Sequence, residues 1–242
     1  MTLIRTGPGV AGVDEAGRGP LLGDVYAACV VLPAEFDDER EDKPMHAWIR
    51  DSKKLAPKRR RAVADYIRRN AVAWGVGSAS VEEIQRLNIA HATFLAMARA
   101  VRAAQAGDSD IQQLLVDGPR FKPPRSNDQD EDPLPSAVRC ICDGDATHMA
   151  IAAASILAKV AHDDHILALV KADPSLDERY GLAHNMGYGT RVHMEGLQRH
   201  GYVPGLHREG FTPVTRARPA SRSGSRESSR PTTPPDRAPD CT

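Results

Sequence analysis

The chain has 242 residues, and its formal net charge is zero because 32 Lys and Arg balance 32 Asp and Glu. This balance excludes a uniformly basic nucleic-acid binder, and a hydrophobic fraction of 41% excludes an acidic disordered chain. The length is enough for one large domain or two small ones, with a core built mainly from aliphatic residues because aromatics make up only 5%.

The apolar pattern predicts short strands that alternate with longer helices. A capping box, Ser80 with Glu83 three residues later, marks the start of one helix. The strands come first and the helices interleave later, which predicts an α/β fold with a mixed β-sheet flanked by helices. In chain order we expect strands at 10–13, 25–32, 71–76, 114–116 and 138–142, and helices at 57–70, 81–104, 149–172 and 190–199.

Two stretches differ in composition from the rest of the chain. Residues 216–242 contain no Val, Ile, Leu, Met or aromatic residue, and their six Arg against three acids give a net charge of +3. They cannot bury apolar surface to offset the entropy of ordering, so we expect a disordered tail. Residues 124–135 are polar with an acidic centre, which indicates an exposed loop insertion. The predicted folded domain therefore spans residues 1–215.

The sequence also bears on cellular location. No apolar run approaches the roughly 18 residues of a membrane helix, and the N-terminus lacks the apolar core of a signal peptide. The four cysteines show no CxxC spacing, which does not predict a disulfide framework. No unpartnered amphipathic face is evident in the sequence. We therefore expect a cytoplasmic monomer with reduced thiols and no membrane partner.

Carboxylates follow three of the predicted strands. Asp14 and Glu15 come after the first strand, Asp117 ends a short apolar run, and Asp143 and Asp145 follow the last one. Because strand ends cluster at one rim in open α/β sheets, these side chains should lie close together. The negative charges of these carboxylates repel one another unless divalent cations are bound between them. Their oxygen ligands suit Mg²⁺ or Mn²⁺. Paired ions of this kind hydrolyse phosphodiesters, which makes a two-metal nuclease the leading hypothesis.

A strongly basic stretch lies at residues 50–70, with nine basic residues and two acids. A solvated helix face is the common explanation of such a run. The size of the charge favours a patch that contacts phosphates, with Ser52, Lys53 and Lys54 as its direct contacts. Six later histidines lack Cys or acidic partners at ligand spacing, so we expect them to be solvent-exposed or capping; they are His162, His165, His184, His193, His200 and His207.

Several motifs together resemble one known family over residues 10–214. They are GVDEAGRGPLLGDV at 12–25, DSKKL at 51–55, LVDG at 115–118, AAASILAKV at 152–160 and GYGT at 187–190. In order and spacing they are similar to ribonuclease HII, the type 2 ribonuclease H. This resemblance implies a ribonuclease H-like fold with a C-terminal helical part. It also implies cleavage of the RNA strand of RNA–DNA hybrids, and cutting 5′ of ribonucleotides embedded in duplex DNA during ribonucleotide excision repair, leaving 5′-phosphate and 3′-hydroxyl ends.

The resemblance also assigns site residues. The catalytic and metal-binding acids would be Asp14, Glu15, Asp117 and Asp145. Asp145 stands ten residues before Ser155, as the family pattern requires, whereas Asp143 occupies the position of a family Lys. Whether Asp143 replaces or assists Asp145 stays open at this point. The substrate-binding residues would be Gly17, Arg18 and Gly19 at the ribose 2′-hydroxyl, Tyr188 against the adjacent sugar, and the Ser52–Lys54 patch.

Two alternatives remain from the residues alone. The first is another ribonuclease H-like nuclease that acts on DNA, against which the Gly-Arg-Gly segment argues. The second is a nucleic-acid-binding protein without activity, whose acids merely terminate strands. A duplex with one embedded ribonucleotide separates the first from the preferred function, and metal titration separates the second.

Overall fold

A computed structural model describes residues 3–36, 44–106, 110–123 and 133–220 of the chain. Within these residues one mixed sheet has the strand order β3-β2-β1-β4-β5. The pairs β1–β2 and β2–β3 are antiparallel, whereas β1–β4 and β4–β5 are parallel. The mixed sheet expected from the sequence is thereby confirmed. The strands are β1 (Val10–Ala16), β2 (Val25–Val31), β3 (Ala73–Ala79), β4 (Gln113–Asp117) and β5 (Ala137–Ile141).

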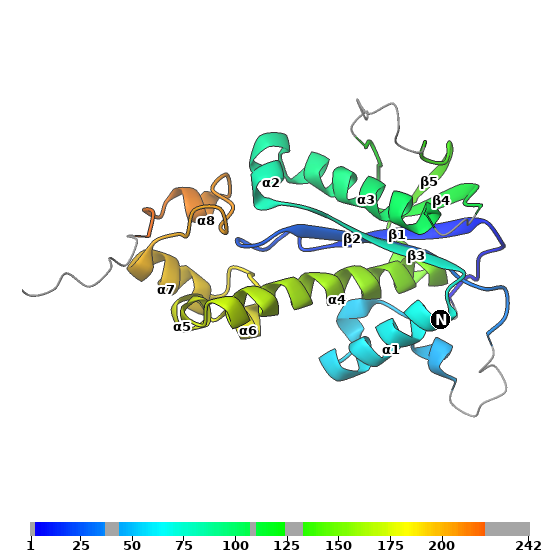
Figure 1. Cartoon of the computed structure of the whole chain (residues 1–242), viewed down its shortest axis with the longest axis horizontal. Coiled ribbons are helices and arrows are strands. Elements are labelled where there is room, and N and C mark those ends of the chain that lie inside the picture. Colours follow the sequence, from blue (N-terminus) through cyan, green and yellow to red (C-terminus); the bar gives the residue numbers. More distant parts are fainter. Residues whose placement is uncertain (1–2, 37–43, 107–109, 124–132, 221–242) are drawn as a thin grey trace, which may run out of the picture.

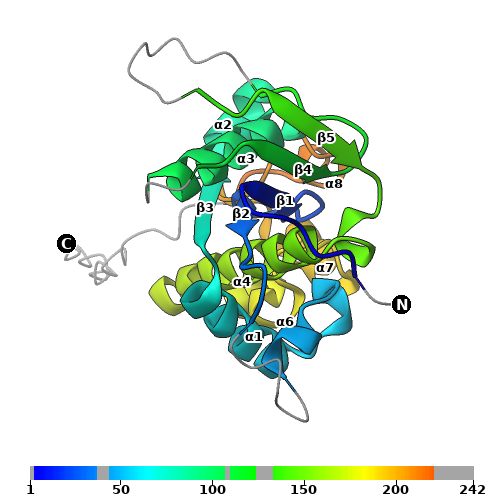
Figure 2. The same ribbon diagram turned by 90° about the vertical axis from the view of Figure 1, so that its right-hand side faces the viewer.

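Helices cover both faces of this sheet (Figures 1 and 2). Helix α3 lies on one face, and the long helix α4 lies on the other with α1 beside it. Helix α2 lies beside α3, whereas helices α5 to α8 gather at the end of α4 and form the expected C-terminal helical part. The helices are α1 (Pro57–Asn70), α2 (Val81–Leu87), α3 (Ile89–Gln105), α4 (Met149–Ala172), α5 (Ser175–Tyr180), α6 (Leu182–Asn185), α7 (Arg191–His200) and α8 (Thr212–Thr215).

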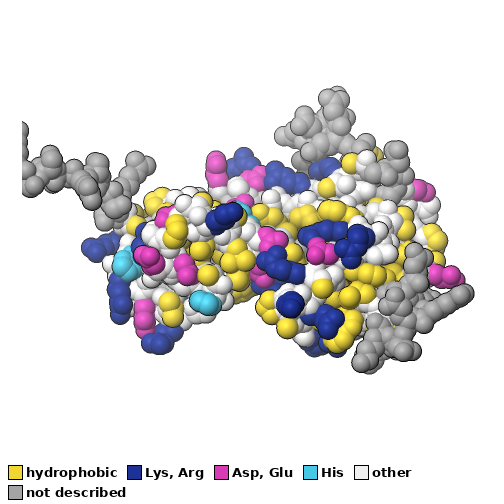
Figure 3. Space-filling model, turned by 60° about the horizontal axis from the view of Figure 1, so that its bottom comes forward, with side chains coloured by type: hydrophobic (Ala, Val, Ile, Leu, Met, Phe, Trp, Pro, Cys, Tyr) yellow, Lys and Arg dark blue, Asp and Glu magenta, His cyan; other side chains and the backbone are white. Residues whose placement is uncertain are grey.

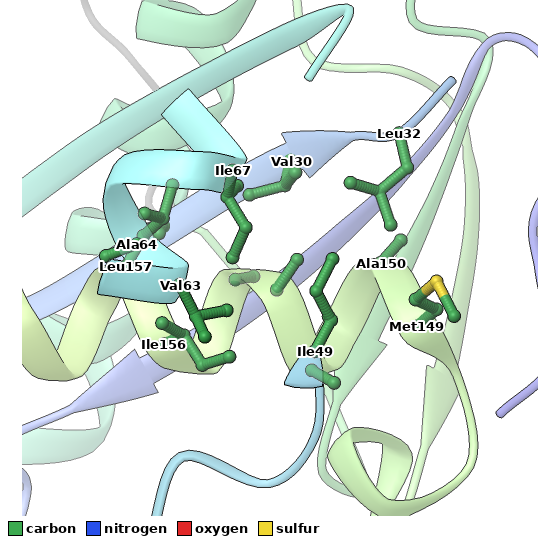
Figure 4. Packing of buried hydrophobic residues seen from close by; sticks show 14 of the residues in the cluster. Val30, Leu32, Ile49, Val63, Ala64, Ile67, Met149, Ala150, Ile156 and Leu157 are labelled. Atoms are coloured by element: carbon green, nitrogen blue, oxygen red, sulfur yellow. The ribbon is translucent and has the colours of Figure 1, made fainter. Parts of the chain in front are cut away.

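Small residues let the helices approach the sheet closely. A side chain at Gly12 on β1 would lie 2.1 Å from the backbone of Ala150 in α4. A side chain at Gly77 on β3 would lie 2.3 Å from the Ala96 carbonyl of α3. Larger residues then fill the space between elements, as where Val63 and Ile67 of α1 meet Leu157 of α4 (Figure 4). Close backbone contact therefore holds α4 against the strand that bears the first two acids.

Several element boundaries differ from the sequence prediction; strand β1, for example, continues to Ala16 and therefore includes Asp14 and Glu15, which were expected after its end. The helix expected over 81–104 is interrupted at Asn88, whose φ of 66° no helix can continue. The Asn88 side chain accepts hydrogen bonds from the N–H groups of Ala90 and His91, so it ends α2 and caps α3. Apolar periodicity continues across this break, which is why the pattern alone predicted one helix. Strand β3 also begins two residues later than expected and extends to Ala79.

The first residues of the expected tail belong to the folded part. The Tyr202 N–H donates to the Arg218 carbonyl at 2.9 Å, and the Ala220 N–H donates to the Tyr202 carbonyl at 2.7 Å. Backbone pairing of this kind needs no apolar side chain, so composition did not predict it. Residues 221–242 of the tail, and residues 124–132 of the acidic insertion, lie outside the described residues. Over the described ranges, no helix is both long and apolar enough to cross a bilayer.

Replacing Gly77 by Ala tests the close approach of α3. The added methyl group would meet backbone atoms of α3 that cannot rotate away, so we expect a loss of about 1–3 kcal/mol in unfolding free energy. Gly7 has open space around its Cβ position and serves as the matched control, with an expected change within about 0.5 kcal/mol. Urea unfolding measures both variants, and equal stabilities would contradict the packing argument.

Candidate active site

The predicted acids meet at the carboxyl ends of neighbouring strands. Asp14 lies on β1 and Asp117 ends β4, and these two strands pair in parallel with Val13 opposite Val116. Asp145 lies in a short 3₁₀ turn, Gly144–Ala146, that follows β5. Together they line a pocket of about 450 Å³. Its lining residues are Asp14, Glu15, Ala16, Gly17, Arg18, Gly19, Ser52, Lys53, Asp117, Asp145, Ser155, Lys159 and Tyr188.

This pocket contains every site residue predicted from the sequence except Lys54. That side chain is largely exposed and lies 3.5 Å from Asp51. Asp143 is also absent from the lining; it is exposed and has a left-handed backbone with φ of 54°. Of the two Asp residues after β5, Asp145 is therefore the one that faces the other acids. A larger pocket of about 660 Å³ lies by α5 and α7, but Asp173 is the only acid among the described residues that line it.

Asp14 is the most buried of the acids, with 5% of its surface exposed. Burial raises the pKa of its carboxyl group well above the ordinary value, and the nearby charges of Glu15, Asp117 and Asp145 raise it further. One Asp14 oxygen accepts a hydrogen bond from the Glu15 N–H at 2.6 Å, which only partly opposes these effects. A bound cation would reverse this cost, because it favours the ionised form.

The other acids carry their own partners. Burial raises the pKa of Glu15, and Arg18, at 3.2 Å from its carboxylate, opposes that shift. One Asp117 oxygen accepts from the Gly144 N–H at 2.7 Å, which ties the end of β4 to the turn bearing Asp145. Burial also raises the pKa of Asp145, assisted by the charges of Asp51 and Asp117. Each acid is thus anchored at the rim of the same pocket.

The donor set of this pocket fits a hard divalent cation. Its four acids offer only oxygen ligands, as Mg²⁺ and Mn²⁺ prefer, and nearby cations such as Arg18 compensate their crowded negative charge only in part. In the part of the chain that the structure describes, no three acid, His or Cys side chains already stand close enough to hold one ion. Hydrogen bonds to Glu15 N–H, Arg18 and Gly144 N–H occupy the carboxylates instead. Cation binding would therefore require the carboxylates to rotate toward the ion, although the four acids already line one pocket.

The Gly-Arg-Gly segment bends away from β1 against α4. Gly17 has a φ of +87°, and a Cβ there would lie 2.4 Å from the His162 ring. A Cβ at Gly19 would lie 3.4 Å from the ring of Tyr188. The Tyr188 ring is 39% exposed and borders the same pocket. Glycine at these positions lets the backbone pack closely against the His162 and Tyr188 rings, with its groups close to any ligand in the pocket.

Buried contacts shape the Ser52–Lys54 segment. It forms a 3₁₀ turn that Asp51 caps by accepting from the Lys53 N–H at 3.0 Å. Arg60, which the sequence placed in the basic patch, is buried and donates to the carbonyls of Ser52 and Leu55. Arg61 pairs with Asp164. The basic stretch is therefore partly structural, and Figure 3 shows acids interspersed among the Lys and Arg side chains on one face of the molecule.

Sequence reasoning missed several residues around the pocket. Ser155 and Lys159, one turn apart on α4, both line it. Lys159 lies 5.6 Å from the Tyr188 ring centre and 2.6 Å from the Asp163 carboxylate. Their i, i+4 spacing within AAASILAKV was the available signal. The expectation of exposed or capping histidines was wrong for His162, His193 and His207, which are fully buried because rings of other elements pack around them.

Comparison with known proteins extends these observations. A family model described as ribonuclease HII matches residues 11–214. Ribonuclease HII of Halorhodospira halophila is 46% identical over 216 residues, which cover 89% of this chain and 98% of that protein. Ribonuclease HII of Laribacter hongkongensis is 47% identical over 208 residues, with 86% and 92% covered.

Solved structures share the fold at lower identity. Ribonuclease H2 from Pyrococcus horikoshii has a TM-score of 0.60 at 22% identity, over 85% of this chain and 95% of that one. Bst-RNase HIII in complex with Mn²⁺ has a TM-score of 0.62 at 18% identity, over 85% and 68%. The expected ribonuclease H-like fold is thereby confirmed. With a family model that spans most of the chain and relatives well above 40% identity, this protein belongs to the ribonuclease HII family.

Proposed function

We propose that this ribonuclease H cleaves the RNA strand of RNA–DNA hybrids and cuts on the 5′ side of ribonucleotides embedded in duplex DNA. Hydrolysis would leave 5′-phosphate and 3′-hydroxyl ends. The observation that carries the proposal is one pocket that holds four converging acids, the Gly-Arg-Gly segment and Tyr188. The acids that could act on a phosphodiester and the groups that could contact a ribose therefore line the same pocket.

The acids would hold two divalent cations, Mg²⁺ or Mn²⁺. Such ions, when bound, lower the pKa of water to give a nucleophile and stabilise the charge on the leaving 3′-oxygen. Asp14, on which the charges of the other three acids all act, would hold the ions together with Glu15, Asp117 and Asp145. No His or Ser side chain is needed as nucleophile.

The rest of the pocket would select and orient the substrate. The backbone of Gly17, Arg18 and Gly19 can approach a ribose closely, and the 2′-hydroxyl is what distinguishes RNA from DNA. The Tyr188 ring offers an apolar face for the neighbouring sugar. Lys53 and Lys159 border the pocket as cations that can neutralise flanking phosphates, which positions the strand without reading its sequence.

In the cell, we propose a cytoplasmic monomer that acts in ribonucleotide excision repair. Its partners would be RNA–DNA hybrids and duplex DNA containing ribonucleotides, with no membrane partner. The basic tail would add sequence-independent attraction to the phosphate backbone.

Changing Asp14 to Asn should abolish Mg²⁺-dependent cleavage of a duplex that contains one ribonucleotide, while hybrid binding remains within about twofold. The acid nearest all its neighbours is lost, whereas the substrate-contacting residues are untouched. End-labelled duplexes with mapping of both products measure this, and an all-DNA duplex is the control. Cleavage of the all-DNA duplex would favour a DNA nuclease, and full activity of Asp14→Asn would defeat the assignment.

Divalent cations should stabilise the folded chain. Because burial raises the pKa of Asp14 above the 3.8 of an ordinary Asp, the folded state loses stability as the pH rises from 3.8 through the raised value. Without metal at pH 7, Asp14→Asn should therefore raise the unfolding free energy. Thermal unfolding in EDTA and in Mg²⁺ measures this. A non-catalytic binder would show no metal-dependent shift for the wild-type chain.

A further inference from the structure

Three segments that are distant in sequence join directly behind the pocket. They are residues 17–24, 186–190 and 206–208. The Leu21 N–H donates to the Gly187 carbonyl at 2.8 Å, which ties the first segment to the loop of Tyr188. The Arg208 N–H donates to the Leu21 carbonyl at 2.8 Å, and the Gly23 N–H donates to the Leu206 carbonyl at 2.9 Å. The two substrate-facing loops therefore share one backbone anchor.

Arg208 is the centre of this anchor. Its side chain is completely buried, and burial lowers the pKa of its guanidinium to about 10, so it stays charged near neutral pH. Instead of a carboxylate it binds backbone carbonyls of the 17–24 segment. The acceptors are the carbonyl oxygens of Gly17 at 2.7 Å, Gly23 at 2.8 Å, Pro20 at 2.9 Å, and Arg18 and Asp24 at 3.1 Å.

This arrangement determines which backbone groups the loop can offer to a ligand. In a trans peptide the C=O and the following N–H point in opposite directions. Arg208 draws the carbonyls of Gly17 and Arg18 inward, so the N–H groups of Arg18 and Gly19 point away from it. Gly17, Arg18 and Gly19 line the pocket. The guanidinium therefore fixes the segment as a donor surface, suited to hydroxyl and phosphate oxygens.

The preceding residue, His207, acts on the other loop. Its Nδ1 accepts from the Val203 N–H at 2.9 Å, so its proton is on Nε2. That N–H donates to Nε2 of His193 at 3.1 Å, which leaves the His193 proton on Nδ1. The His193 Nδ1–H then donates to the Tyr188 carbonyl at 3.0 Å. The partners thus assign both tautomers, and the two rings form a directional relay that ends on Tyr188.

The His193 and His207 rings are both fully buried, which keeps them neutral. Burial lowers the pKa of His193, and burial together with His193 lowers the pKa of His207 to about 3. Tyr180 packs against both rings, with ring centres 5.6 Å from His193 and 4.8 Å from His207. The Tyr188 loop needs such a support, because Met186 is held at a φ of 50°, which non-glycine residues seldom adopt.

We propose that His207 and Arg208 are positioning residues for substrate recognition. Arg208 fixes the Gly-Arg-Gly donor surface, and His207 acts through His193 to hold Tyr188 at the sugar. Neither side chain lines the pocket, so both act through the loops that do. This inference rests on the proposed function for its substrate.

A double-mutant cycle tests the relay. His207→Leu should raise KM for a duplex with one ribonucleotide about tenfold, with kcat within about twofold, because a ground-state contact is loosened. In a Tyr188→Ala background the same change should alter KM less than about twofold, since its route to the substrate is already gone. His193→Leu should also raise KM, because it removes the donor to the Tyr188 carbonyl. His193→Asn keeps an amide N–H donor near that carbonyl, so its KM should stay close to the wild-type value. Equal effects of His207→Leu in both backgrounds would overturn the relay.

A stability control separates positioning from general weakening of the cluster. Tyr180→Phe removes the hydroxyl that donates to the Gly201 carbonyl at 2.8 Å but keeps the ring against both histidines. It should lower the unfolding temperature and leave KM unchanged. An increase in KM for Tyr180→Phe as large as that for His207→Leu would show that KM follows stability, and would overturn the proposal.

Arg208→Lys tests the second arm, because an ammonium keeps the charge but cannot reach five carbonyls. Fluorescence anisotropy in the Asp14→Asn background compares a ribonucleotide-containing duplex with an all-DNA duplex. Arg208→Lys should reduce the preference for the ribonucleotide about tenfold, and a folded variant with unchanged preference would overturn this role. If Arg208→Lys fails to fold, the His207 cycle decides. Failure of the proposed function would instead appear as no cleavage by the wild-type chain, whereas this binding readout needs no cleavage.

Discussion

The contact between helix α4 and the segment from Gly12 to Gly23 is the constraint on which the site depends. The segment touches α4 at three glycines, where Gly12 meets Ala150, Gly17 meets His162 and Gly23 meets Ile166. The sixteen residue-to-residue steps from 150 to 166 span about 24 Å, so the helix is a rigid support for strand β1 and the loop after it. Because each contact is tight, the acids and the Gly-Arg-Gly segment have little freedom relative to Ser155 and Lys159 on the same helix. A long, Ala-rich helix thus positions the site as well as filling the core.

Electrostatics explains why the rest of the site is arranged around that support. Strand pairing forces Asp14 and Asp117 together, and Asp145 follows from the turn tied to Asp117 through Gly144. Folding therefore brings like charges into a partly buried pocket, which is costly unless a cation is bound. The surrounding cations do not cancel this charge fully: Arg18 reaches Glu15, whereas Lys159 is engaged by Asp163. The negative charge that remains favours metal binding and lowers the stability of the metal-free protein.

The gathering of the acids could be predicted because a carboxylate after an apolar run is visible at the level of a few residues. The roles expected for Gly17, Arg18, Gly19 and Tyr188 came from the family resemblance. The mixed sheet followed from the order of strands and helices, but the break at Asn88 did not, because one capping side chain overrides a continuous apolar stripe. The roles of Arg60, His207 and Arg208 were invisible for another reason. Their partners are backbone carbonyls or a histidine at long range, and composition has no signal for such pairs.

Two buried arginines have structural roles that the net charge of the chain does not reveal. Arg208 places a full charge in the interior, which is tolerable because five carbonyl dipoles surround it and the charge of Asp24 also favours the protonated guanidinium. Arg60 uses the same device on the Ser52–Lys54 turn, where it binds two carbonyls as well as Asp163. In both cases an inner guanidinium shapes a loop from behind, and the other side of that loop faces the pocket. Part of the chain's positive charge therefore organises backbone groups for the substrate without touching it, so a chain with zero net charge can still present an ordered polar surface to a nucleic acid.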